Sequence, residues 1–126
     1  MNINEQSQQV KASDLLNPIA QKIFDKKGEN ILALDVHSIS SLTDYFIIAD
    51  GNVSRHLNAI ASDVIELMVS AGHPPLYLDG KNDSDWIVID FGQIIVHLFT
   101  ADMREKYALE KLWHEGKIVD LNISVS

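Results

Sequence analysis

The sequence predicts an α/β protein in which a mixed β-sheet is flanked by helices. Segments with apolar residues at helical spacing alternate along the chain with short runs of β-branched and aromatic residues. A chain of 126 residues is long enough for one hydrophobic core and too short for two comfortable ones. We therefore expect a single α/β domain over residues 13–115. Residues 1–12 are polar and without periodicity, so we expect them to form a flexible arm.

The first half of the chain contains two predicted helices and two predicted buried strands. The apolar residues of the first helix are Leu15, Leu16, Ile19 and Ile23. The apolar runs ILALDV (31–36) and YFIIAD (45–50) predict the strands. A long amphipathic helix follows, from Ser54 to just before Gly72. The stretch HPPLYLDG (73–80) then predicts a turn and a short third strand.

The segment 84–100, SDWIVIDFGQIIVHLFT, predicts a β-hairpin. It has more consecutive strand-forming residues than one strand usually holds, and Gly92 lies at its middle. We place the loop either at the central Phe-Gly pair or over residues 90–93. Both placements give the same register, in which Trp86 pairs directly with His97.

The predicted hairpin has two different faces, because successive side chains of a strand point to opposite sides of the sheet. One face is wholly apolar and comprises Ile87, Ile89, Ile94, Val96 and Leu98. The other face is mixed and comprises Trp86, Val88, Asp90, Gln93, Ile95, His97 and Phe99. We expect the apolar face to be core. The mixed face is solvated, or covered by a helix that satisfies its polar groups, or a contact site with an aromatic anchor.

The last part of the chain predicts a helix and a terminal segment. Residues 103–113, MREKYALEKLW, form the predicted helix, which carries Tyr107, Leu112 and Trp113. Core packing is the simpler explanation of these large side chains, and the alternative is that they extend the surface around Trp86. Residues 116–126 contain alternating apolar positions that suit either an edge strand or a C-terminal tail.

Composition narrows the classes of function. The chain has no cysteine, which excludes disulfides, thiol catalysis and thiolate metal sites. The net charge of −8 argues against direct nucleic-acid binding, which needs a basic face for the phosphates, and favours a basic protein surface as partner. No stretch approaches the roughly 18 consecutive apolar residues of a membrane span. The polar start has no signal-peptide pattern, so we expect a cytoplasmic protein without a membrane partner.

The polar residues allow two chemical interpretations, a metal site and a catalytic pair. Asp35 and His37, together with Asp90 and His97, would form a nitrogen and oxygen metal site if the fold brought them together. A catalytic Asp–His pair would need a nucleophile or an orienting group, and none stands at a recognisable spacing. No glycine-rich nucleotide-binding motif occurs in the chain. We expect no metal, no cofactor and no catalytic residues.

Three segments of the chain carry a family resemblance, and they are SSLTDYFIIADGNVSRHLNAIASDV, PPLYLDGKNDSDWIVIDFGQIIVHLFT and REKYALEKLW. They resemble the ribosomal silencing factor family, also called Iojap-related proteins, over about residues 15–114. The distinctive motifs are Thr43-Asp44-Tyr45, Ser54-Arg55, Asp79-Gly80, Asp85-Trp86, Asp90-Phe91-Gly92, Val96-His97 and Leu109-Glu110-Lys111-Leu112-Trp113. The arm, residues 1–12, and the terminal segment, residues 116–126, lie outside it.

The resemblance implies a fold similar to that of nucleotidyltransferases. Enzymes of that fold use a Gly-Ser helix start and paired carboxylates on a strand to hold magnesium. Here Gly51 is followed by Asn52, and Asp90 lacks the second aspartate of an Asp-x-Asp pair. This departure argues that transfer chemistry is absent. The alternative function is a metal-dependent nucleotidyltransferase or phosphohydrolase that uses Asp35, Asp90 and His97.

The resemblance also implies a role on the ribosome. The family binds the large ribosomal subunit through ribosomal protein L-fourteen, sterically blocks association with the small subunit, and so represses translation when nutrients are scarce. Its members are commonly homodimers in isolation. A large-subunit assembly factor that uses the same surface stays an alternative. We expect this chain to share the repressor role and to have no enzymatic activity.

We predict that the mixed face of the hairpin is the docking surface. Trp86 is the predicted anchor, and Asp90 and Gln93 provide polar pairing at the turn. His97 supports the indole or forms a hydrogen bond with the partner. Secondary candidates for the same surface are Tyr107, Leu112 and Trp113.

Overall fold

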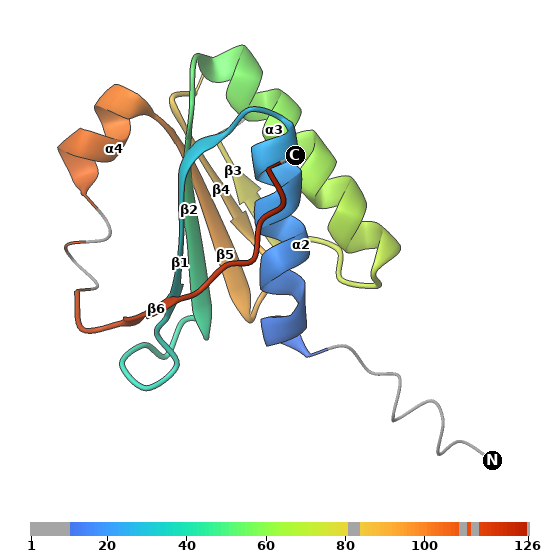
Figure 1. Ribbon diagram of the computed structural model, residues 1–126, viewed down its shortest axis with the longest axis vertical. Helices are drawn as coiled ribbons and strands as arrows, with labels where there is room; N and C mark the ends of the chain where they lie inside the picture. The colour runs from blue at the N-terminus through green and yellow to red at the C-terminus, as the bar shows by residue number, and fades with distance from the viewer. Residues whose placement is uncertain (1–10, 81–83, 109–110, 112–113, 126) are drawn as a thin grey trace.

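The computed structural model describes residues 11–80, 84–108, 111 and 114–125. The strands of this part are β1 (Glu29–Asp35), β2 (Tyr45–Gly51), β3 (Tyr77–Asp79), β4 (Trp86–Asp90), β5 (Ile94–Thr100) and β6 (Lys117–Val119). They form one sheet in the order β3-β4-β5-β2-β1-β6. Strands β2 and β5 are parallel and all other neighbours are antiparallel, so the predicted mixed sheet is confirmed (Figure 1).

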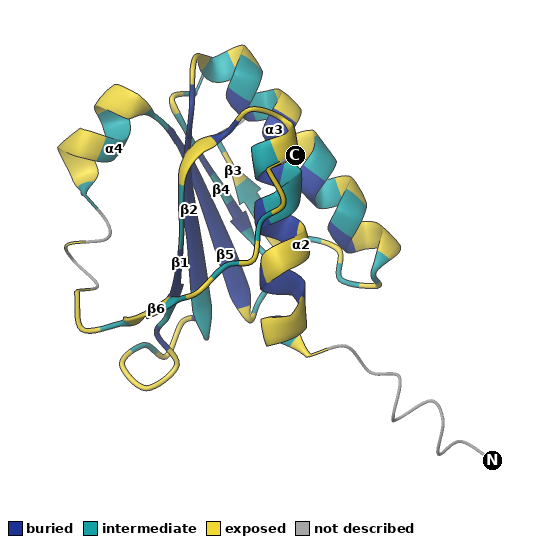
Figure 2. Ribbon diagram, viewed as in Figure 1, coloured by how far each residue is buried: buried dark blue, intermediate teal, exposed yellow. Residues whose placement is uncertain are grey.

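The helices cover the two faces of the sheet unequally. Helices α2 (Ala12–Asp25) and α3 (Ser54–Ser70) pack on one face, and the short helix α4 (Ala101–Tyr107) lies on the other (Figure 1). The strands in the middle of the sheet are largely buried, whereas α4 has no buried residue (Figure 2). No helix in the described residues is long and apolar enough to cross a bilayer.

The apolar face of the hairpin is core, as the sequence predicts. Its five side chains are at most 1% exposed and pack under α2 and α3. The other face of the sheet carries a second apolar cluster, which includes Phe46, Ile95 and Phe99. Trp86 and Val88 pack against this second cluster from its edge, and Met103 packs against it from α4. The mixed face of the hairpin is therefore partly buried and not simply solvated.

The predicted pairing within the hairpin is wrong by two residues. The structure pairs Trp86 with Phe99, and Val88 with His97. The two faces survive this error, because the direction of side chains repeats every two residues. The assignment of side chains to the two faces is therefore correct, although the predicted pairing of residues across the hairpin is not.

The hairpin loop consists of Gly92 and Gln93, closed by the Phe91 N–H donating to the Ile94 carbonyl at 2.9 Å. Gly92 has a φ of +95°. In two-residue hairpin loops the first central position needs a positive φ, which glycine adopts readily. The two-residue loop that we predicted would put Phe91 in that position, where its Cβ disfavours the conformation.

Helix α4 is shorter than predicted. It ends at Tyr107, and Ala108 has a left-handed backbone with a φ of 47° and donates its N–H to the Arg104 carbonyl at 2.8 Å. Leu112 and Trp113 lie outside the described residues, as does the N-terminal arm up to residue 10.

Of the two alternatives for the terminal segment, the structure shows an edge strand followed by an extended stretch. Strand β6 pairs with β1, and the chain then runs beside α2. The Asn122 N–H donates to Asn17 Oδ1 at 2.9 Å. Gln21 accepts from the Ser124 N–H at 2.7 Å and donates to the Ser124 carbonyl at 3.0 Å. The side-chain amides of the helix thus replace the backbone partners that a neighbouring strand would supply.

Replacing Gln21 with alanine is expected to release the stretch around Ser124, because both hydrogen bonds to that residue are lost. Amide exchange at Ser124 should accelerate, while the free energy of unfolding falls by only about 1 kcal/mol. Hydrogen exchange followed by NMR measures the first effect and urea denaturation the second. Lys22→Ala, one position along the same helix, serves as control, and unchanged exchange at Ser124 in Gln21→Ala would show that the amide contacts do not hold this stretch.

Candidate functional site

An aromatic cluster lies where β4, β5 and α4 meet, and it consists of Trp86, His97, Phe99 and Tyr107. The Trp86 ring stacks on Phe99 with centroids 4.9 Å apart. Tyr107 approaches the indole from α4 at 4.7 Å. The Trp86 Nε1–H donates to His97 Nδ1 at 3.2 Å. The structure therefore brings together Trp86, His97 and Tyr107, three of the residues that we named as docking candidates.

His97 is buried behind the indole, with the Phe46 ring 5.3 Å from its own. Burial disfavours the charged imidazole and lowers the pKa of His97 to about 4. The ring is thus neutral at neutral pH. Because Nδ1 accepts from the indole, the proton lies on Nε2. This arrangement suits a residue that orients Trp86 better than one that exchanges protons near pH 7.

Asp90 and Gln93 lie apart from the aromatic cluster. Asp90 is at the far end of β4, four residues from Trp86, which corresponds to about 13 Å along the strand. Its Oδ1 accepts from the Gly92 N–H at 2.7 Å, so this carboxylate stabilises the hairpin turn. Gln93 is exposed in the same turn. The predicted surface is therefore split into an aromatic part and a turn part.

The residues of the predicted metal site do not converge. Asp35 aligns with Tyr45 of β2, which aligns with the start of β5, so Asp35 and Asp90 are separated by three strand spacings, or about 14 Å. Asp35 instead contacts His37, whose Nδ1 lies 2.6 Å from Oδ1, and this hydrogen bond lowers the pKa of Asp35. No group of three or more potential metal ligands occurs in the described part of the chain. The hypothesis that joins Asp35 to Asp90 and His97 in one site is contradicted.

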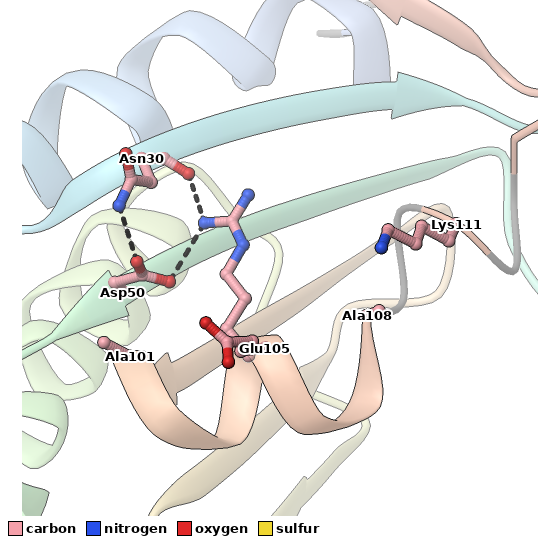
Figure 3. Close-up of a pocket in the computed structure, with 7 residues that line it drawn as sticks. Asn30, Asp50, Ala101, Glu105, Ala108 and Lys111 are labelled. Carbon is pink, nitrogen blue, oxygen red and sulfur yellow. Dashed lines mark hydrogen bonds and ion pairs between the residues drawn. The ribbon is translucent and has the colours of Figure 1, made fainter.

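A buried polar site, which sequence reasoning missed, lies on the same face of the sheet as the aromatic cluster. Asp50, at the end of β2, is 6% exposed and accepts from Arg104 Nη1 at 3.0 Å. Its other oxygen accepts from Asn30 Nδ2 at 2.7 Å. The same Nη1 of Arg104 also donates to the Asn30 backbone carbonyl (Figure 3). Asp50 and Arg104 are 54 positions apart, so no spacing rule could have paired them.

A pocket of about 480 Å³ opens beside this polar site. It is lined by Asn30, Asp50, Ala101, Arg104, Glu105, Ala108 and Lys111 (Figure 3). A second pocket, of about 410 Å³, lies between the start of α3 and α4, where Asp85 and Asp102 contribute carboxylates and Lys106 an ammonium group. Both pockets have charged side chains in their lining. The second lies near the aromatic cluster, since Asp85 precedes Trp86, and Met103, which also lines this pocket, packs against the second apolar cluster.

Comparison with known proteins shows which family this chain matches. The family model "Ribosomal silencing factor during starvation" matches residues 9–125. A ribosomal silencing factor of Bacillus subtilis is 36% identical over 112 residues, which cover 89% of this chain and 95% of that protein. One from Haemophilus influenzae is 47% identical over 87 residues, which cover 69% and 85%. The mouse "Mitochondrial assembly of ribosomal large subunit protein 1" is 33% identical over 78% of this chain and 44% of that protein.

The fold agrees with this assignment. A crystal structure of a protein from Chromobacterium violaceum superposes with a TM-score of 0.80 at 26% identity, and the match covers 93% of this chain and 95% of that one. The family match runs from the last residues of the arm through β6 to the stretch held by α2, so it includes the terminal segment that the motifs left out. The chain belongs to the ribosomal silencing factor family.

Proposed function

We propose that this protein represses translation by occupying a surface of the large ribosomal subunit. It binds the large ribosomal subunit through ribosomal protein L-fourteen and keeps the small subunit from joining, above all when nutrients are limiting. The observation that carries the proposal is the family match over residues 9–125, because the family is described as silencing ribosomes during starvation. The protein works in the cytoplasm and is a homodimer when it is off the ribosome.

The proposed docking surface is centred on the aromatic cluster. Trp86 is only partly buried, and Tyr107 beside it is 41% exposed, so a partner can reach both rings. Aromatic residues of this kind commonly anchor protein interfaces. The exposed carboxylates of Asp85 and Asp102 next to them complement a basic ribosomal protein.

The hairpin turn is a second contact point of the same interface. Asp90 lies about 13 Å from Trp86, with Gln93 in the turn beyond it, and a standard interface, of about 800 Å² on each partner, is wide enough to include the turn and the aromatic cluster. Leu112 and Trp113 are proposed to belong to this surface from their place in the sequence.

The proposed mechanism needs no bond chemistry. Steric exclusion requires a surface and an affinity, and the polar residues that could have served an enzyme have structural partners. Asp90 holds the turn, Asp35 contacts His37, and His97 accepts from Trp86. We therefore propose a regulatory protein without catalytic residues, metal or cofactor.

The test is to add the purified protein to separated ribosomal subunits and to follow their association on a sucrose gradient. The protein is expected to co-sediment with the large subunit and to reduce the peak of joined ribosomes as its concentration rises. The small subunit alone, run with the same protein, is the control for non-specific binding. Full association in the presence of saturating protein would refute the proposal.

A role in large-subunit assembly is the second candidate. The name of the mouse relative, which refers to assembly of the mitochondrial large subunit, favours it. The two roles differ in what a deletion strain accumulates. An assembly factor leaves immature large subunits in growing cells, whereas a repressor leaves mature subunits that stay joined during starvation. Gradient profiles of the deletion strain in both growth states separate the two.

A further inference from the structure

Helix α4 is held to the sheet by few contacts. It has seven residues and none of them is buried, yet it carries Tyr107 onto the indole of Trp86. Met103 adds a partly buried apolar contact with the second cluster. The most enclosed polar contact of the helix comes from Arg104, whose side chain is only 12% exposed.

Arg104 ties α4 to two strands at once. Its Nη1 donates to Asp50 Oδ1 on β2 and to the backbone carbonyl of Asn30 on β1 (Figure 3). The register of β1 with β2 shifts between Glu29 and Leu32, and within this bulge Asn30 has a left-handed backbone with a φ of 52°. Bulges of this kind redirect the groups of the residues within them. The result is a three-element connection centred on one guanidinium group.

The position of Arg104 in the helix connects this site to the aromatic cluster. Arg104 and Tyr107 are three residues apart, so their side chains leave neighbouring positions on one side of α4. An anchor at Arg104 therefore limits how far Tyr107 can rotate or lift away from Trp86. A buried ion pair also depends on both partners, because removing one leaves an uncompensated charge.

We propose that Asp50 and Arg104 are positioning residues that hold α4 so that Tyr107 stays on Trp86, and thereby keep the docking surface assembled. The part of this inference that concerns the ribosome rests on the proposed function. The part that concerns the two rings is a property of the free protein and can be tested without the ribosome.

The first test measures the exposure of Trp86 in the free protein. The chain has two tryptophans, so the variants are made with Trp113→Phe to leave Trp86 as the sole fluorophore. Asp50→Asn is expected to raise acrylamide quenching of Trp86 at least twofold and to shift its emission to longer wavelength. Asp63→Asn is the matched control, because it removes the same charge from the more exposed Lys26–Asp63 pair, in which Lys26 Nζ lies 3.1 Å from Asp63 Oδ2.

A folded Asp50→Asn protein with the quenching of the control would overturn the inference. If Asp50→Asn alone does not fold, the double variant Asp50→Asn/Arg104→Met removes both charges of the buried pair and leaves neither uncompensated. Its far-ultraviolet circular dichroism should match that of the parent, while its Trp86 quenching should still rise. Parent-like quenching in a folded double variant would equally overturn the inference.

The second test measures binding. In co-sedimentation with large subunits, Asp50→Asn in a chain that keeps Trp113 is expected to bind at least tenfold more weakly than Asp63→Asn in the same chain. Increased quenching with unchanged binding would overturn the link between α4 and docking. If the unmodified protein does not bind large subunits, the proposed function fails, and the quenching experiment still decides whether Asp50 and Arg104 position Tyr107.

Discussion

Replacing Trp86 with alanine is expected to weaken binding to the large ribosomal subunit by about 2–4 kcal/mol, which is roughly a 30- to 1,000-fold change in the dissociation constant. The indole is partly exposed at the centre of the proposed docking surface, beside the ring of Tyr107. Truncation removes a large aromatic side chain that the partner can cover. Co-sedimentation with isolated large subunits at several protein concentrations measures the effect.

Trp86→Ala also removes contacts inside the protein, so the binding effect needs matched controls. The indole stacks on Phe99 and donates to His97, and both contacts are lost in the variant. Circular dichroism at the assay temperature must show that the variant remains folded. Val69→Ala truncates an exposed apolar side chain on α3, beyond the opposite face of the sheet, and should bind normally. Binding of Trp86→Ala that equals that of Val69→Ala would remove Trp86 from the interface.

The second large effect is a loss of stability in acid that comes from His97. Its pKa is about 4 in the folded protein, whereas the ordinary value is 6.5. Between these two pH values the unfolded chain binds a proton that the folded protein excludes. The stabilisation is therefore complete above pH 6.5 and is lost as the pH falls through the folded value. The difference between the two pKa values corresponds to about 3 kcal/mol in the free energy of unfolding.

Urea denaturation at pH 7 and pH 4.5 measures this effect. Carboxylates also titrate in this range, so the contribution of His97 is the difference between the parent and His97→Gln. The glutamine side chain stays neutral and retains an oxygen that can accept from Trp86. The variant should lose less stability in acid than the parent, while His114→Gln, at an exposed histidine, should behave like the parent. Equal acid sensitivity of His97→Gln and the parent would show that burial of His97 does not cause the loss.

The hairpin shows which features of a structure a local sequence pattern can predict. Alternation of apolar and polar residues was enough to assign each side chain to its face, because that assignment depends only on neighbours in the chain. The pairing depended on the loop, and there the need for a positive φ at Gly92 decided the register. Trp86 still reaches His97 from the pairing observed, since diagonal neighbours on one face lie within reach of aromatic side chains.

The candidate site was predictable only in part. The hairpin sequence identified Trp86 and His97 as residues of one face, but it grouped Asp90 with them although the length of β4 separates it from Trp86. The predicted helix over residues 103–113 was too long, because nothing in its composition predicts the left-handed backbone of Ala108. The Asp50–Arg104 pair was missed altogether, since its members look like ordinary polar residues at the end of a strand and in a helix.

By itself the sequence determined the α/β class, the mixed sheet, the two faces of the hairpin and the membership of the family. Only the tertiary structure decided that Arg104 joins α4 to Asp50, that Tyr107 covers Trp86, and that Asp35 stays far from Asp90. Periodicity and turn chemistry are set by residues close together in the chain. Contacts between distant residues depend on the order of strands and on where a helix ends, and those are decided by packing of the whole domain.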